Sequence, residues 1–203
     1  MKSACRPGKA HRPGARRKPL KPDHRHFFLF FCAVENDRPA KATDPHVARM
    51  VDFLERIGLS VRFGEIGEPT VVPGILLDHG GIVVDEARLS YPGDLLHEAG
   101  HLAVMSAERR RQIHRDAGND PAEEMAAIAW SYAAALHLGL DPAVVFHEAG
   151  YRGGARALVE NFSAGRYVGV PILQWLGLAE DPRTAVAAGR RPYPEMIRWV
   201  TER

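Results

Sequence analysis

Cysteine is scarce in this sequence of 203 residues. Both cysteines, Cys5 and Cys32, lie near the N-terminus, so the rest of the chain offers no disulfide and no thiolate ligand for a metal. The apolar stretch FFLFFCAV at residues 27–34 is far shorter than the ~20 residues that a membrane-spanning helix needs. No small-x-small cleavage site follows it. We therefore expect a cytoplasmic protein without a membrane partner.

An excess of positive charge is present in only one segment. The net charge is +2, yet residues 1–26 carry nine Lys and Arg against the single acid Asp23, which leaves the remaining chain near −6. Residues 1–40 are basic, rich in Pro and Gly, and predicted to be a disordered tail. This tail is either an electrostatic arm for nucleic acid or anionic lipid, or a plain extension. The rest of the chain gives no reason to expect nucleic-acid binding.

Four Asp-Pro pairs mark helix starts, because Asp caps the first amides and Pro suits the first helical position. Helices are expected at residues 44–57, 94–111, 121–138, 142–149, 154–164, 171–176, 182–188 and 193–201. Strands are expected at residues 59–63, 75–77 and 82–84, the last two flanking a turn. The predicted fold class is α+β, with a small mostly antiparallel sheet packed on one helix and a largely helical C-terminal half. Residues 41–203 would form a single domain, with 139–203 as a helical extension.

The motif His-Glu-Ala-Gly-His at residues 97–101 matches H-E-x-x-H. On a helix, His97 and His101 lie one turn apart on the same face, so both imidazoles can reach one ion. Zinc accepts neutral imidazole, and Glu98 beside that face can take a proton from water at the metal. Apolar neighbours embed this helix in the interior: Leu95, Leu96, Leu102 and Val104.

A catalytic zinc site needs a third protein ligand, and the helix expected at 121–138 offers Glu123 and Glu124. With Asp120 as N-cap, Glu123 occupies the capping-box position and would reach back to the helix start. Glu124 is then free, and its face continues through small residues that would permit close helix packing. Glu124 is the predicted third ligand, with Glu123 as the alternative.

This pattern resembles the gluzincin arrangement of thermolysin-type metallopeptidases. Over residues 44–138 the layout is similar to the ImmA/IrrE-like small bacterial metallopeptidases, in which the second helix opens with E-x-x-A, here Glu124 to Ala127. The resemblance implies that the strand before the motif, residues 82–85, lines the cleft and pairs with an extended peptide. Ile128 stands where that family has a polar residue, and residues 139–203 match nothing in it. FtsH-type proteases share HEAGH, but they imply an all-helical domain and an ATPase module.

A second His-Glu-Ala-Gly occurs at residues 147–150 and is followed by Tyr151 instead of histidine. Gly150 is expected to stop the helix, so this copy cannot form a second site of the same kind. In one interpretation, His147 or Tyr151 donates a hydrogen bond to the substrate carbonyl in the first site. In the other, His147 is an ordinary residue at a helix end. Further donor candidates are His114, Tyr132 and Tyr167.

The sequence thus predicts a zinc metallopeptidase in which His97, His101 and Glu124 bind Zn2+ and Glu98 is the general base. Its partner would be a protein or peptide substrate, or a regulatory protein. The alternative is a non-catalytic regulatory or toxin–antitoxin-type binding protein in which the metal only braces two helices. That alternative predicts a closed site with four protein ligands and no water, or no metal at all.

Overall fold

The computed structural model describes residues 42–187 and 189–202. The basic tail predicted at residues 1–40, with both cysteines, lies outside the described residues. The sheet has four strands in the order β1-β3-β2-β4: β1 (Val61–Phe63), β2 (Ile75–Asp78), β3 (Gly81–Val84) and β4 (His114–Arg115). β3 pairs with β1 in parallel and with β2 antiparallel, and β4 pairs antiparallel with β2. The sheet is therefore mixed, within the α+β class predicted from the sequence.

Seven α-helices and two short 3-10 turns make up the rest of the described chain. The helices are α1 (Pro45–Arg56), α2 (Asp94–Val104), α3 (Ala107–Gln112), α4 (Pro121–His137), α5 (Ala155–Ser163), α6 (Val170–Trp175) and α7 (Pro182–Ala185). The 3-10 turns are Pro142–Val144 and Tyr151–Gly153. Asp44, Asp120 and Asp181 cap α1, α4 and α7 through their side chains, as the Asp-Pro pairs predict.

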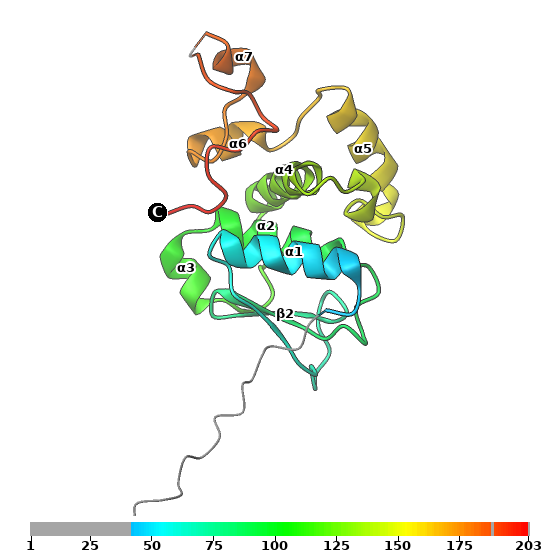
Figure 1. Cartoon of the computed structure of the whole chain (residues 1–203). Helices are drawn as coiled ribbons and strands as arrows, with labels where there is room; N and C mark the ends of the chain where they lie inside the picture. The colour runs from blue at the N-terminus through cyan, green and yellow to red at the C-terminus, as the bar shows by residue number, and fades with distance from the viewer. Residues whose placement is uncertain (1–41, 188, 203) are drawn as a thin grey trace, which may run out of the picture. The chain divides into compact units, whose positions relative to one another are not determined.

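Helix α2 is the centre of the described fold. It contacts α1 and strand β2 on one side and α4 on the other, so it lies between the sheet layer and the C-terminal helices (Figure 1). A Cβ atom added to Gly100 would lie 2.9 Å from the carbonyl oxygen of Ala127, and only glycine permits this approach of α2 to α4. The small-residue face of α4 therefore packs closely on the motif helix, as predicted.

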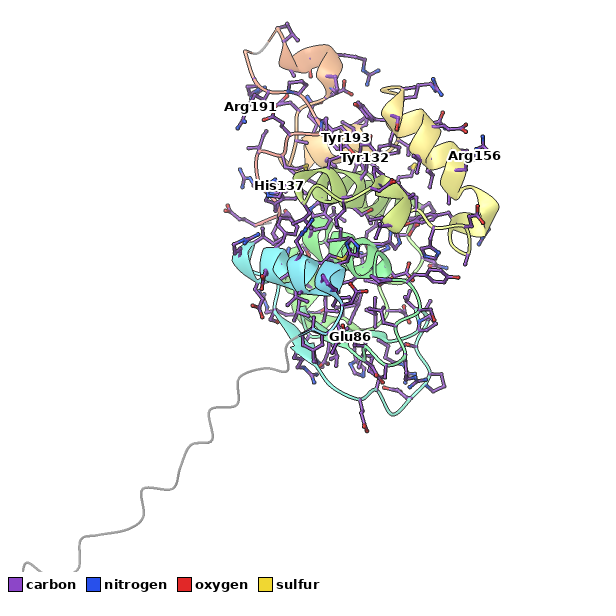
Figure 2. The ribbon with its side chains drawn as sticks, turned by 45° about the vertical axis from the view of Figure 1, so that its right-hand side comes forward. Glu86, Tyr132, His137, Arg156, Arg191 and Tyr193 are labelled. Carbon is purple, nitrogen blue, oxygen red and sulfur yellow. The ribbon has the colours of Figure 1, made fainter. Side chains whose placement is uncertain are left out.

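The C-terminal part packs on α4 through aromatic side chains. Tyr132 of α4 stacks on Tyr193 at a ring-centroid distance of 6.5 Å, and Phe162 contacts both rings (Figure 2). The buried Tyr193 hydroxyl donates a hydrogen bond of 2.8 Å to the carbonyl of Ala129. These contacts bury large aromatic surfaces and fix the helix that carries Glu124.

Four expected helices differ from the structure. Residues 94–111 form two helices, because Met105 is extended and Ser106 caps α3. Residues 142–149 form only one 3-10 turn, since the chain there packs against the start of α2. Residues 182–188 are helical only as far as Ala185. Residues 193–201 are not helical, because their amides bond elsewhere: Tyr193 N–H to Glu180, Ile197 N–H to Leu178 and Thr201 N–H to Ala103.

No helix in residues 42–187 or 189–202 is long and apolar enough to cross a membrane. The cytoplasmic location stays a prediction.

Candidate metal centre

Three potential metal ligands converge between α2 and α4. The Nε2 atoms of His97 and His101 are 3.3 Å apart, and the Oε2 atom of Glu124 lies 3.5 Å from the first and 3.2 Å from the second. The two histidines come from one face of α2, and Glu124 comes from the first turn of α4. This buried triad (His97, His101 and Glu124) can hold a metal ion.

The spacing of the three donor atoms fits zinc. Zinc bonds of about 2.0–2.1 Å in a tetrahedral arrangement place neighbouring ligand atoms about 3.3 Å apart. The observed separations of 3.2–3.5 Å lie close to this value. Hydrogen bonds from His101 and His97 hold the pKa of Glu124 well below its usual range, so this carboxylate is ionised and ready to bind a cation.

Glu123 contacts His101 on Nδ1, the ring nitrogen that does not face the other two ligands. Its Oε1 lies 3.3 Å from Nδ1 of His101, and its other oxygen accepts from Arg109. A carboxylate on the outer nitrogen orients a metal-binding imidazole and leaves the other nitrogen for the ion. Burial lowers the pKa of His101, but the hydrogen bonds with Glu123 and Glu124 raise it to about 9. The predicted capping role of Glu123 is wrong, because its carboxylate contacts His101 and Arg109. Glu123 thus supplies the polar support that Ile128 does not provide.

Glu98 lies in the same cleft as the triad. A cavity of about 500 Å³ is lined by Glu98, His97, His101 and Glu124 and opens to solvent. Burial raises the pKa of Glu98, although the charges of His97 and His101 oppose this shift. A carboxylate with a raised pKa is a stronger base than an exposed one, which suits proton transfer.

The second His-Glu-Ala-Gly forms one wall of this cleft. The helix expected over residues 142–149 ends at Val144, so the interpretation of His147 as a helix-end residue is wrong. Its Nε2 lies 2.8 Å from Oδ1 of Asp94 in the first turn of α2, and Tyr91 stacks on its ring at 3.8 Å. Glu148 is exposed. The second copy is thus neither a second site nor a ligand set, and His147 anchors the segment that follows it.

That segment places Tyr151 next to the triad. The ring of Tyr151 meets the ring of His97 edge-on at 5.5 Å. Tyr151 lines the cleft, and its hydroxyl is buried. This hydroxyl has no hydrogen-bond partner among the residues that the structure describes. Burial and the charges of Asp94, Glu124 and Glu98 raise the pKa of Tyr151 far above its usual value, so the hydroxyl keeps its proton. Tyr151 and Arg152 both have left-handed backbone, with φ of 55° and 52°.

Other residues singled out in the sequence lie elsewhere. Tyr132 and Tyr167 belong to the aromatic cluster over α4, and His114 lies on strand β4; none of the three lines the cleft. Residues 82–85 cannot offer a free strand edge to a peptide, because β3 is paired on both sides with β1 and β2. The cleft is bordered instead by residues 71–75 and 115–118.

No protein-family model, curated protein or solved structure matches this chain. The likeness to ImmA/IrrE-like metallopeptidases therefore rests on the motif, the order of elements and the buried triad alone.

Proposed function

We propose that this protein is a zinc-dependent metallopeptidase, in which His97, His101 and Glu124 hold the metal and Glu98 is the general base. The observation that carries the proposal is the convergence of three donor atoms at 3.2–3.5 Å beside a carboxylate of raised pKa in one open cleft. Among the described residues the cluster has three members, and the cavity borders it. Three protein ligands with an accessible side are typical of catalytic zinc, whereas structural zinc has four.

A zinc ion at this position supplies a Lewis acid that polarises a carbonyl and lowers the pKa of water. Glu98 accepts a proton from water as the water oxygen adds to the peptide carbonyl carbon. Glu98 then donates this proton to the amine nitrogen as the C–N bond breaks. Glu123 keeps the His101 ring in place during these steps through the contact at Nδ1.

Tyr151 is the residue that we assign to the substrate carbonyl. Its protonated hydroxyl is buried and has no competing partner among described side chains, and Tyr151 lines the cleft with its ring against His97. A donor aimed at an oxygen that gains negative charge stabilises the transition state more than the bound substrate. Asp94 and Tyr91 hold His147, and His147 in turn fixes the approach of the chain to Tyr151.

The substitution Glu98→Gln tests the proposal. The variant should bind zinc as tightly as the parent and lose peptide hydrolysis by about 10²- to 10⁴-fold, because glutamine cannot accept the proton. Zinc content by metal analysis and cleavage of a casein or mixed-peptide substrate by mass spectrometry provide the two readouts. The exposed Glu148, from the second copy of the motif, gives a matched control as Glu148→Gln, which should retain full activity.

Equal cleavage by the Glu98→Gln variant and the parent would exclude this mechanism. Zinc binding without any peptide cleavage by the parent would instead favour the non-catalytic alternative, in which the metal joins α2 to α4 and the protein acts by binding a partner.

A further inference from the structure

A second group of imidazoles and a carboxylate lies at one end of the sheet, outside the cleft. It comprises Asp78, the last residue of β2, His79 in the turn that follows, and His114, the first residue of β4. We call these three residues the surface cluster. The pairing register places Asp78 directly opposite His114, and the His79 amide donates to the carbonyl of Ile113 at 2.8 Å. The backbone of three segments therefore fixes the cluster.

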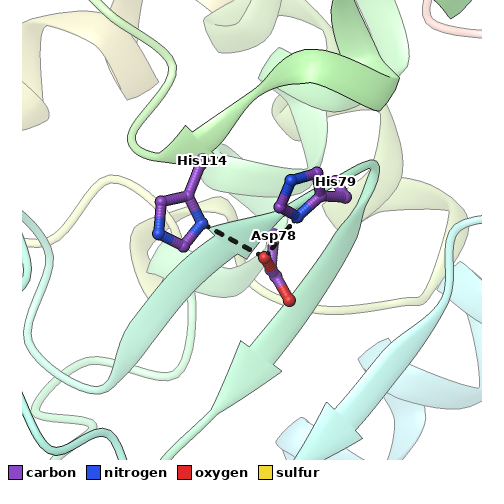
Figure 3. Close-up of side chains that lie close together, drawn as sticks. All are labelled: Asp78, His79 and His114. Atoms are coloured by element: carbon purple, nitrogen blue, oxygen red, sulfur yellow. Dashed lines mark hydrogen bonds and ion pairs between the residues drawn. The ribbon is translucent and has the colours of Figure 1, made fainter.

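The donor atoms of the surface cluster face one another. Nδ1 of His79 is 2.7 Å from Oδ1 of Asp78, and Nδ1 of His114 is 3.1 Å from the same oxygen (Figure 3). All three candidate ligand atoms lie within 4.8 Å of one another. The second oxygen of Asp78 is held by Arg62 at 2.5 Å, which turns the first oxygen toward the imidazoles.

The turn fixes the position of His79. Asp78 pairs with Gly81, so His79 and Gly80 form a two-residue hairpin loop, and their φ values are 49° and 90°. Positive φ at both positions defines a type I′ turn, for which Asn-Gly is the favoured sequence. Histidine, like asparagine and aspartate, is enriched among the non-glycine residues of the left-handed region, so the turn accommodates it. The turn therefore holds the His79 imidazole beside the carboxylate of Asp78.

We propose that the surface cluster is a second metal site, which binds a divalent transition-metal ion through His79, His114 and Asp78. Two imidazole nitrogens with one carboxylate oxygen suit Zn2+, Ni2+ or Cu2+, and disfavour Mg2+ and Ca2+, which prefer oxygen ligands. The His79 and His114 side chains are 66% and 50% exposed, so the site exchanges its ion readily and binds more weakly than the buried triad.

An ion at the surface cluster has a structural effect near the cleft. β4 consists of two residues, and it pairs with only two residues of β2, Leu77 and Asp78. An ion bound to both His114 and the β2–β3 turn adds a cross-strand link to this short strand. Because residues 115–118 border the cleft, the link steadies one of its walls.

The substitution His79→Asn is the sharpest test, because asparagine suits the type I′ turn and removes the imidazole without disturbing the backbone. Ni2+ and Zn2+ binding to the full chain is measured by equilibrium dialysis, with folding checked by circular dichroism. At a Ni2+ concentration that just fills the cluster of the parent, His79→Asn should bind close to one ion fewer, because its cluster should bind Ni2+ at least tenfold more weakly. His46→Asn, which changes an exposed histidine on α1, is the matched control and should bind as the parent does.

His114→Gln provides a second variant and should lose the same ion. In the parent, Ni2+ should also slow hydrogen exchange of the amides near residues 113–115, and His79→Asn should abolish this protection. Parent-like binding by both His79→Asn and His114→Gln would overturn the proposal. The result is independent of the buried triad, since Glu98→Gln and the parent should bind the second ion alike.

Discussion

The buried triad and the surface cluster are built from the same kinds of side chain, two histidines and one carboxylate, but their imidazoles differ in burial. In the triad, the side chains of His97 and His101 are 13% and 7% exposed, and a second carboxylate, Glu123, supports His101. In the surface cluster, both imidazoles are half exposed or more, and the carboxylate is shared with Arg62. The carboxylates show no such contrast, since the Glu124 side chain is 44% exposed and that of Asp78 is 25% exposed.

The difference in burial between the two pairs of imidazoles shows how the surrounding protein affects metal ligands. Buried ligands are oriented by packing, and their neighbours shift pKa values and supply a general base and a hydrogen-bond donor. The surface cluster also has a shifted group, because hydrogen bonds with His79 and Arg62 lower the pKa of Asp78 to about 2. Its neighbour Arg62 is a cation, however, and cannot act as a general base. We therefore assign chemistry to the triad and binding alone to the surface cluster.

The largest expected effect is on zinc affinity, and it distinguishes the triad from the surface cluster. His101→Ala should weaken zinc binding at the triad by about a hundred- to a thousandfold, because a structural zinc site gains roughly 10–16 kcal/mol, or about 2.5–4 kcal/mol for each of four ligands. His114→Ala should leave zinc at the triad in place. Zinc titration of both variants against a chromophoric chelator checks this. Equal losses in the two variants would show that the triad is not the tighter site.

The next largest expected effect is the loss of the Tyr151 hydroxyl, the hydrogen-bond donor beside the triad. Tyr151→Phe should lower kcat for peptide hydrolysis by about 10²- to 10³-fold, with zinc content unchanged, because the hydroxyl contacts the substrate oxygen in the transition state. Steady-state kinetics provides the measurement. Tyr167→Phe, which alters a hydroxyl outside the cleft, is the control, and a similar loss in that variant would argue against a specific role for Tyr151.

Stability in the presence of a chelator should depend on pH through His101. Its pKa is raised from 6.5 to about 9 in the folded protein, so the folded state holds this proton more tightly than the unfolded state. The resulting stabilisation is complete below about pH 6.5 and is lost as the pH rises through 9, by at most about 3 kcal/mol. Urea unfolding at several pH values measures the trend.

Excess zinc should reverse this trend, since the ion competes with protons for the imidazole. The variant His101→Gln should show a flatter pH profile with chelator, whereas His114→Gln should keep the slope of the parent. A parent profile without slope between pH 6.5 and 9 would contradict the assignment to His101.

The smallest expected effect tests the support behind the triad. Glu123→Gln should weaken zinc binding about 10- to 100-fold, because the amide orients the His101 ring less strongly than a carboxylate does. The loss should be smaller than that caused by Glu124→Gln, which removes a charged ligand. If Glu123→Gln costs more than Glu124→Gln, the roles of the two residues are the reverse of our assignment.

Much of the fold could be predicted from local patterns. The Asp-Pro caps and helical spacing predict α1 and α4, and the turn between residues 77 and 82 predicts the β2–β3 hairpin. β4 could not be predicted, because two residues carry no periodicity and their strand exists only through pairing with β2. Residues 145–149 were expected to be helical, but contacts with α2 determine their conformation.

Some residues of the candidate site could likewise be predicted from local sequence, and others could not. His97 and His101 share one helix, so their spacing alone predicts a common ion. Glu123 was assigned to the helix start by a local rule, and the tertiary contacts with His101 and Arg109 outweigh that rule. The place of Tyr151 depends on a hydrogen bond between residues 53 positions apart in the chain, His147 and Asp94, which no local pattern reveals.

The close contact of Gly100 with Ala127 has a consequence for how this protein can change over evolutionary time. His97 and Glu124 each lie three residues before that contact, so one helical turn carries both the packing and the ligands. Any larger side chain at Gly100 would part the helices and respace the donor atoms together. A substitution at Gly100 therefore changes both the stability of the helix pair and the geometry of the metal ligands. Selection at this position acts on the two properties together.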